Sequence, residues 1–195
     1  MDLHLLESIS VGLGLGIAAG FRVVVPFWVL SIAAVFAHLP LSDNMAWLDS
    51  ETAFAGLTIA LVVELLAYTI PWLDNAVDIV ALPVAAAAGT LLMALAADQL
   101  DPFAKWSLAI VAGGGAAATA KGLNGFTRLL STATTGGLTN LLVAIAEFVG
   151  AIALSLLALT APLVAVIVAL ILVLLLFRVV TNLVSKPKQQ PANVE

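Results

Sequence analysis

The stretch GLGLGIAAGFRVVVP, from Gly12 to Pro26, decides the fold class. It lies within an apolar region that runs from Leu5 to Leu39. This region is too long for one helix across a bilayer, which needs about 20 apolar residues, and too short for two helices with a loop. Because glycines and a proline interrupt it, we expect a broken or re-entrant helix up to Gly20. A membrane-spanning helix should follow from about residue 21 to residue 39.

The composition supports a bilayer as the solvent for this chain. Hydrophobic residues make up 63% of the sequence and charged residues only 10%, against about 45–50% and about 25% in soluble domains. The net charge of −5 argues against nucleic-acid binding. Cysteine is absent, and the two histidines, His4 and His38, lie far apart in the sequence. We therefore expect no disulfide, no metal site and no cofactor.

The other apolar runs are continuous rather than alternating, which favours helices over barrel strands. The predicted helices cover residues 52–70, 76–97, 106–120, 138–160 and 161–177. We expect a tight turn at PWLDN, residues 71–75, and a small, polar, basic loop at KGLNGFTRLLSTATTGG, residues 121–137. The sequence thus predicts an all-α integral membrane protein with about six transmembrane helices and one or two broken or re-entrant segments. Residues 1–184 would form a single transmembrane domain, and the polar tail 185–195 would be disordered.

The two halves of the chain, residues 5–97 and 105–184, share an order of features. Each has a Gly-rich segment, then a basic residue in GFR or GFTR, then a helix that contains a glutamate. An internal two-fold repeat is therefore a hypothesis, in either a parallel or an inverted arrangement. The positive-inside rule places the C-terminus in the cytoplasm and the acidic segments DNMAWLDSE and DQLD on the other side of a bacterial inner membrane or its equivalent. It also places Arg22, Lys121 and Arg128 near the inner face.

Glu64 and Glu147 each lie inside an apolar run. An ionised carboxylate at such depth costs at least about 2.5 kcal/mol, so each should face protein or water and have a partner. The functional interpretation is coupling or gating by a change of protonation, or service as counter-charge to a buried cation. The structural alternative is a protonated Glu64 that hydrogen-bonds locally, for example to Tyr68.

Basic residues beside the Gly-rich segments suggest an anion site. Near Gly20 and Pro26 the chain should break, so that backbone amides and the guanidinium of Arg22 converge, and helix N-termini and arginine both bind anions. The alternative is that the glycines only allow helices to pack closely. The predicted substrate-binding residues are Arg22, Lys121, Arg128, Asn124, Gly20 and Gly125.

Asp74, Asn75 and Asp78 form a polar group after Pro71. Acids at the start of a helix cap its amides, and a pair four residues apart could instead bind a cation. A D-N-x-x-D string also occurs in membrane prenyltransferases, where it holds a metal diphosphate. That reading would require an enzyme that acts on a lipid phosphate.

The order of these motifs resembles a family of small bacterial integral membrane proteins that is catalogued as a domain of unknown function. The similar elements are Gly20 and Arg22, the string E-x6-P-x-x-D-N-x-x-D that begins at Glu64, and Lys121 and Arg128 followed by Glu147. The resemblance implies the membrane architecture and no particular activity.

We expect a small transporter or channel for an anionic or proton-coupled solute, and not an enzyme. Its partners would be the bilayer, the small anion or protons, and a second copy of the chain, packed through Gly and Ala faces. A membrane scaffold or assembly factor that transports nothing is the alternative, and the lipid-phosphate enzyme comes third.

Overall fold

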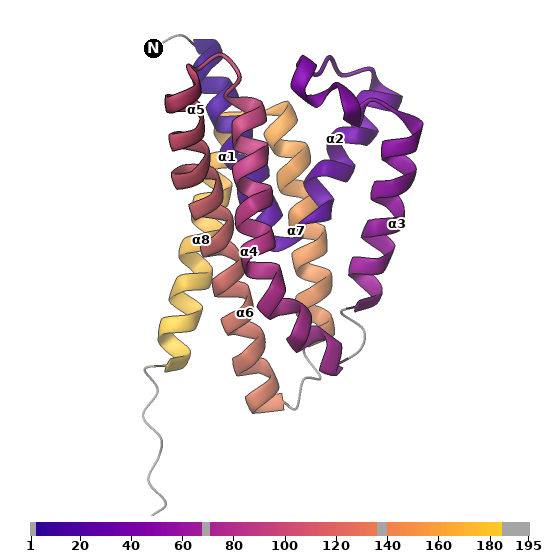
Figure 1. Cartoon of the computed structure of the whole chain (residues 1–195). Coiled ribbons are helices and arrows are strands. Elements are labelled where there is room, and N and C mark those ends of the chain that lie inside the picture. The colour runs from indigo at the N-terminus through magenta and orange to yellow at the C-terminus, as the bar shows by residue number, and fades with distance from the viewer. Residues whose placement is uncertain (1–2, 68–70, 136–139, 185–195) are drawn as a thin grey trace, which may run out of the picture.

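The computed structural model is an all-helical bundle (Figure 1). The structure describes residues 3–67, 71–135 and 140–184. In these ranges the α-helices are α1 (Leu3–Phe21), α2 (Val24–Ala37), α3 (Glu51–Ala67), α4 (Pro71–Ala96), α5 (Pro102–Leu108), α6 (Gly115–Thr135), α7 (Asn140–Thr160) and α8 (Pro162–Val184). A 3₁₀ helix, η1 (Asp43–Leu48), precedes α3, and a π-helical segment, η2 (Ala109–Gly114), joins α5 to α6.

Three helical stretches in the described ranges are long and apolar enough to cross a membrane. They are Leu3–Phe21, Leu142–Thr160 and Pro162–Asn182. The last of them is largely unburied, and it exposes large apolar side chains such as Ile167, Leu174 and Phe177. A surface of this kind is suited to lipid rather than water. These helices indicate a membrane protein.

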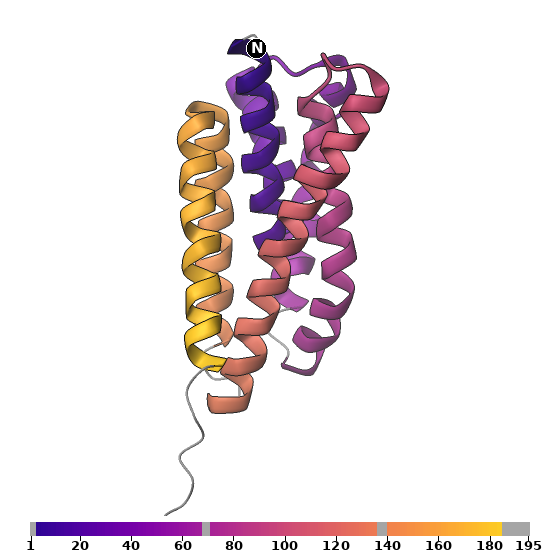
Figure 2. The ribbon, with the colours of Figure 1, turned by 90° about the vertical axis from the view of Figure 1, so that its left-hand side faces the viewer.

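The chain reverses direction between α1 and α2. Helix α1 ends at Phe21, and α2 begins at Val24, so only Arg22 and Val23 form the turn. Figure 1 and Figure 2 show that α1 ends partway along the bundle, well short of the lower ends of α6 and α8. The predicted break after Gly20 is confirmed. The prediction of a membrane-spanning helix over residues 21–39 was wrong, because α2 has only 14 residues, too few to cross a bilayer. Pro26 lies in the first turn of α2, where its missing N–H removes no intrahelical hydrogen bond.

The glycines of α1 lie inside one continuous helix and serve close packing. A Cβ built on Gly20 would lie 2.5 Å from the carbonyl oxygen of Ala117 in α6. A Cβ on Gly89 of α4 would lie 2.5 Å from the carbonyl oxygen of Gly113, and one on Gly16 would lie 3.4 Å from that same oxygen. Helices α1, α4 and α6 with η2 therefore approach backbone to backbone, as small residues permit in membrane bundles.

Two predicted loops are helical, so these predictions were wrong. PWLDN is the beginning of α4, where Pro71 suits the first helical position. Residues 121–135 belong to α6, which runs unbroken from Gly115 to Thr135. The polar residues of this segment do not face solvent as those of a loop would, because Lys121 and Arg128 are buried against other helices. The hydroxyl of Thr127 donates to the carbonyl of Leu123 in the same helix.

The acidic segments lie together at one end of the bundle, as expected. The amide of Asn44 in η1 donates to Asp98 after α4 at 2.7 Å, and Lys105 of α5 forms an ion pair with the same carboxylate at 2.7 Å. The N-terminus of α1 lies at this end and the last residues of α8 at the other (Figure 1). The tail 185–195, predicted to be disordered, lies outside the described residues. The internal repeat stays a prediction, since the first Gly-rich segment ends in a turn and the second continues as a helix.

Candidate functional site

One face of α6 is buried and changes along the helix from small residues to polar ones. Ala117, Ala120, Lys121, Asn124 and Arg128 follow helical spacing and share one face. The two alanines pack against α1 at Gly20. The three polar residues come next along the helix, beyond the level at which α1 ends, and each is at most 3% exposed. Long polar side chains therefore fill the bundle interior next to the α1–α2 turn.

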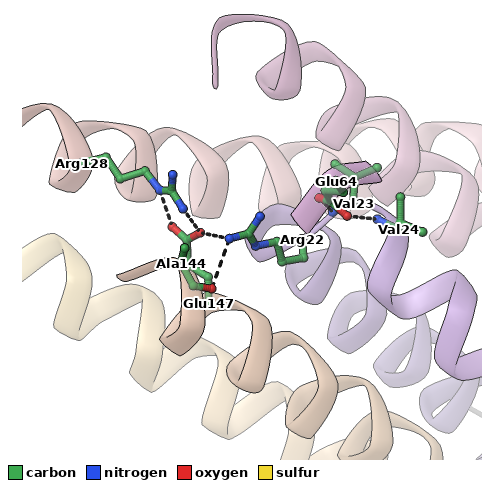
Figure 3. A network of polar contacts seen from close by, with 7 residues as sticks. All are labelled: Arg22, Val23, Val24, Glu64, Arg128, Ala144 and Glu147. Carbon is green, nitrogen blue, oxygen red and sulfur yellow. Dashed lines mark hydrogen bonds and ion pairs between the residues drawn. The ribbon is translucent and has the colours of Figure 1, made fainter. Parts of the chain in front are cut away.

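Glu147 of α7 binds two arginines inside the bundle (Figure 3). Arg128 donates from Nε to Oε1 at 3.1 Å and from Nη2 to Oε2 at 2.7 Å. Arg22 Nη2 lies 3.4 Å from the same Oε2 and donates to the carbonyl of Ala144 at 3.1 Å. The three charged side chains are between 1% and 4% exposed. One carboxylate thus joins the α1–α2 turn to α6 and α7.

Glu64 of α3 caps the N-terminus of α2. Its Oε1 accepts from the amide of Val23 at 3.1 Å, and its Oε2 accepts from the amide of Val24 at 3.3 Å. Arg22 and Lys121 also act electrostatically on this carboxylate. The amides at the N-terminus of α2 thus bind a carboxylate of the chain itself. The binding of a solute anion at this break stays a prediction. The alternative bond to Tyr68 lies outside the described residues.

The structure brings together residues from both halves that the sequence singled out. Arg22 lies between Glu147 and Glu64 (Figure 3), and Glu147 is the counter-charge expected for Arg22 and Arg128. The three cations lie inside the bundle rather than in a loop at one of its ends.

The other predicted site residues are Asn124, the glycines Gly20 and Gly125, and the polar group at the start of α4, and each has a different environment. Asn124 is 2% exposed, and among the described residues its Nδ2 has no hydrogen-bond acceptor. Gly20 packs on α6, whereas a Cβ on Gly125 would meet nothing within 4 Å. The third group, Asp74, Asn75 and Asp78, lies in the first turns of α4, with side chains outside the described part of the chain.

The sequence did not identify the backbone groups that complete the network. The sequence does indicate the amides of Val23 and Val24, because the break before Pro26 predicts a helix N-terminus at these residues. The sequence does not indicate the carbonyl of Ala144, since no side-chain pattern marks a backbone acceptor. Among the described residues, no group of three or more His, Cys, Asp or Glu lies together as metal ligands would.

A pocket of about 260 Å³ lies apart from the charged network, beside η1 and the start of α1. Apart from Ser8 and Ser42, its lining is apolar: Val11, Leu30, Leu39, Pro40, Leu41, Met45, Leu95, Ala96 and Leu159. The ionisable groups therefore meet in a region shielded by protein, and not in this pocket.

The network offers two places where a small anion could replace a carboxylate. One is the position of the Glu147 carboxylate between two guanidiniums, and the other is the position of Glu64 on the amides of α2. Loss or protonation of Glu147 would remove a negative charge from beside Arg22 and Arg128, which is costly in a buried site. Loss of Glu64 would take this acceptor from two amides of α2.

Comparison with known proteins assigns a family but no activity. No curated protein and no solved structure matches the chain. One family model matches residues 9–182, which is most of the chain. The chain therefore belongs to the family described as Domain of unknown function (DUF4126).

Proposed function

We propose that this protein is a small membrane transporter or channel for an anionic or proton-coupled solute. The observation that carries the proposal is the Glu147 carboxylate, which is shared by Arg22 and Arg128 in the interior of an apolar bundle. Ionisable residues inside a membrane are costly and commonly mark the paths of ions and solutes.

The path of the chain supports this proposal. In the proposed topology, α1 and α2 form a re-entrant hairpin. The bilayer is crossed by α3, by α4, by the consecutive helical segments α5, η2 and α6 (the α5–η2–α6 rod), by α7 and by α8. The turn places the C-terminal end of α1 and the N-terminal end of α2 inside the bundle, beside Arg22 (Figure 3). Discontinuous helices whose ends meet near the middle of the membrane form the substrate sites of many transporters.

Each charged residue has a role in the proposal. Arg22 and Arg128, with Lys121, bind the anion, and Asn124 contributes a neutral donor. Protonation of Glu147 weakens its hold on both arginines and admits the anion. Glu64 holds the hairpin turn in place and gates the site when its bonds to the α2 amides open.

The membrane setting belongs to the same proposal. The acidic end of the bundle faces outward and the C-terminal end, with the exposed Arg178, faces the cytoplasm, in keeping with the positive-inside rule. The host is a bacterial inner membrane or its equivalent. A second copy of the chain completes a dimer, and no covalent chemistry is assigned to the protein.

A scaffold that transports nothing is the second candidate, and one observation favours it. Glu147 binds both arginines at once and Glu64 binds two amides, so each carboxylate joins separate helices as a structural staple would. In that case the charged network only holds the fold together.

A flux assay separates the two candidates. Wild-type protein is reconstituted into liposomes with a pH-sensitive dye and a panel of small anions, beside Glu147→Gln and a matched control, Asp98→Asn. Asp98 lies in an exposed ion pair at the bundle end. We expect wild type and the control to move anions or protons, and Glu147→Gln to lose flux or its pH dependence by about tenfold, which is the effect of about 1.4 kcal/mol. Absence of both fluxes in the wild type would leave the scaffold.

A further inference from the structure

We propose that Arg22, Arg128 and Asn124 form a binding site for a small, planar, monovalent oxyanion such as formate or nitrate. The Glu147 carboxylate is the group that this anion displaces. This inference rests on the proposed function, and it names the class of solute that the site selects.

The geometry around Arg128 defines a planar ligand. Its Nε and Nη2 reach the two oxygens of Glu147 at 3.1 Å and 2.7 Å, which is the side-by-side pairing of a guanidinium with a carboxylate. Arg22 Nη2 approaches the second oxygen from another side, at 3.4 Å. A free carboxylate or nitrate presents the same pair of oxygens at the same spacing. A halide is a single atom, so it accepts from both donors of Arg128 only through bent, weaker hydrogen bonds.

Asn124 supplies the observation that points to a ligand. It lies one helical turn before Arg128 on the same face of α6 and is 2% exposed. In the part of the chain that the structure describes, its Nδ2 has no acceptor, although buried amide nitrogens are almost always hydrogen-bonded. An anion held by Arg128 would accept a hydrogen bond from Asn124 Nδ2, either through a third oxygen, as in nitrate, or through a second lone pair on one of its two oxygens.

Charge sets the valence of the ligand. The Glu147 carboxylate brings one negative charge to the two guanidiniums, and this charge is lost when Glu147 is protonated or moves aside. One monovalent anion restores the present balance, and a metal cation would be repelled by both arginines. The site is therefore specific for an anion of the size and charge of the carboxylate that it now holds.

The test is a binding titration of the full chain in detergent, without vesicles. Sodium formate, sodium nitrate and sodium chloride are compared at equal ionic strength by calorimetry and by the unfolding temperature. The variants are Glu147→Gln, which removes the resident charge at nearly equal volume, and the double variant Glu147→Gln with Asn124→Leu. The matched control adds Ser155→Ala to Glu147→Gln, because Ser155 is a buried residue of α7 that bonds only within its own helix.

We expect formate and nitrate to bind Glu147→Gln at least about tenfold more tightly than wild type and to raise its unfolding temperature. Asn124→Leu should weaken that binding about tenfold, and Ser155→Ala should leave it unchanged. Equal effects of chloride and formate would overturn the oxyanion class. An unchanged formate affinity in the Asn124→Leu variant would overturn the role of Asn124.

Two further measurements keep the inference open to refutation. Where Glu147→Gln does not fold, the single variants Asn124→Ser and Asn124→Leu are compared with wild type in the same titration, and equal formate affinities in all three would refute the site. Flux in liposomes without formate binding in detergent would refute this inference alone. Formate binding without flux would refute the transport function and leave the site standing.

Discussion

Glu147 is the residue through which separate parts of the chain meet. Its carboxylate contacts Arg22 from the α1–α2 turn and Arg128 from α6, and all three side chains are buried. Removal of one partner from a buried ion pair costs about 3–5 kcal/mol, because the remaining charge stays desolvated. The pair itself contributes much less than this cost, since its attraction is offset by desolvation.

A double-mutant cycle measures the difference. We expect Glu147→Leu and Arg128→Met each to lower the free energy of unfolding by about 3 kcal/mol or more, and the double variant to lose less than the sum of the two. The measurement is unfolding of the detergent-solubilised chain. Strictly additive losses would mean that the two side chains do not depend on each other, contrary to the contacts at 3.1 Å and 2.7 Å.

At the scale of single residues, the sequence predicted which charged residues need partners better than it predicted which acid pairs with which base. The cost of a charge in an apolar run marks Glu64, Glu147 and Arg22 as residues that require partners. Which acid meets which base depends on how the helices pack. Glu64 lies nearer to Arg22 in the sequence, yet it binds backbone amides, and the ion pair of Arg22 is with Glu147.

At the scale of the element, the contact between α1 and α6 depends on Gly20. A Cβ there would lie 2.5 Å from the carbonyl oxygen of Ala117 and 2.6 Å from the Cβ of Ala120, and neither atom belongs to a flexible side chain. We expect Gly20→Ala to lower the free energy of unfolding by about 1–3 kcal/mol, because overpacking forces the helices apart. Thermal unfolding in detergent is the measurement.

Gly150→Ala is the matched control for that substitution. Gly150 lies inside α7, and a Cβ on it would meet nothing within 4 Å. The control should be neutral or stabilising by about 0.5–1 kcal/mol, since alanine is the better helix former. Equal destabilisation by both substitutions would show that close packing at Gly20 is not what the fold requires.

Helix α6 shows why part of the fold could not be predicted. Its segment 121–135 reads as a polar loop when polarity is taken as a sign of solvent, but Lys121, Asn124 and Arg128 are spaced for one face of a helix. A membrane interior can bury such a face only if other helices supply partners, and Glu147 lies in a different helix. Three apolar segments were predicted closely, since α3, α7 and α8 begin within two residues of their predicted starts at 52, 138 and 161.

At the scale of the whole molecule, the topology of the chain depends on the proposal that α1 and α2 form a re-entrant hairpin. Because α1 and α2 enter and leave at the acidic end, the proposed crossings begin with α3. In the proposed topology, two crossings separate Asp49 from Asp101, and three more separate Asp101 from Asn182. The first two residues should therefore face one side of the membrane and the third the other side.

The absence of native cysteine makes a direct test feasible. Asp49→Cys, Asp101→Cys and Asn182→Cys each place one thiol at an exposed position. In sealed vesicles of one orientation, we expect a membrane-impermeant maleimide to label the first two from the same side and the third only from the opposite side. Ser155→Cys, buried in α7, is the negative control and should stay unlabelled until the protein is unfolded. Labelling of Asp101→Cys and Asn182→Cys from one side would require an even number of crossings between them, and the proposed path through the α5–η2–α6 rod, α7 and α8 would then be wrong.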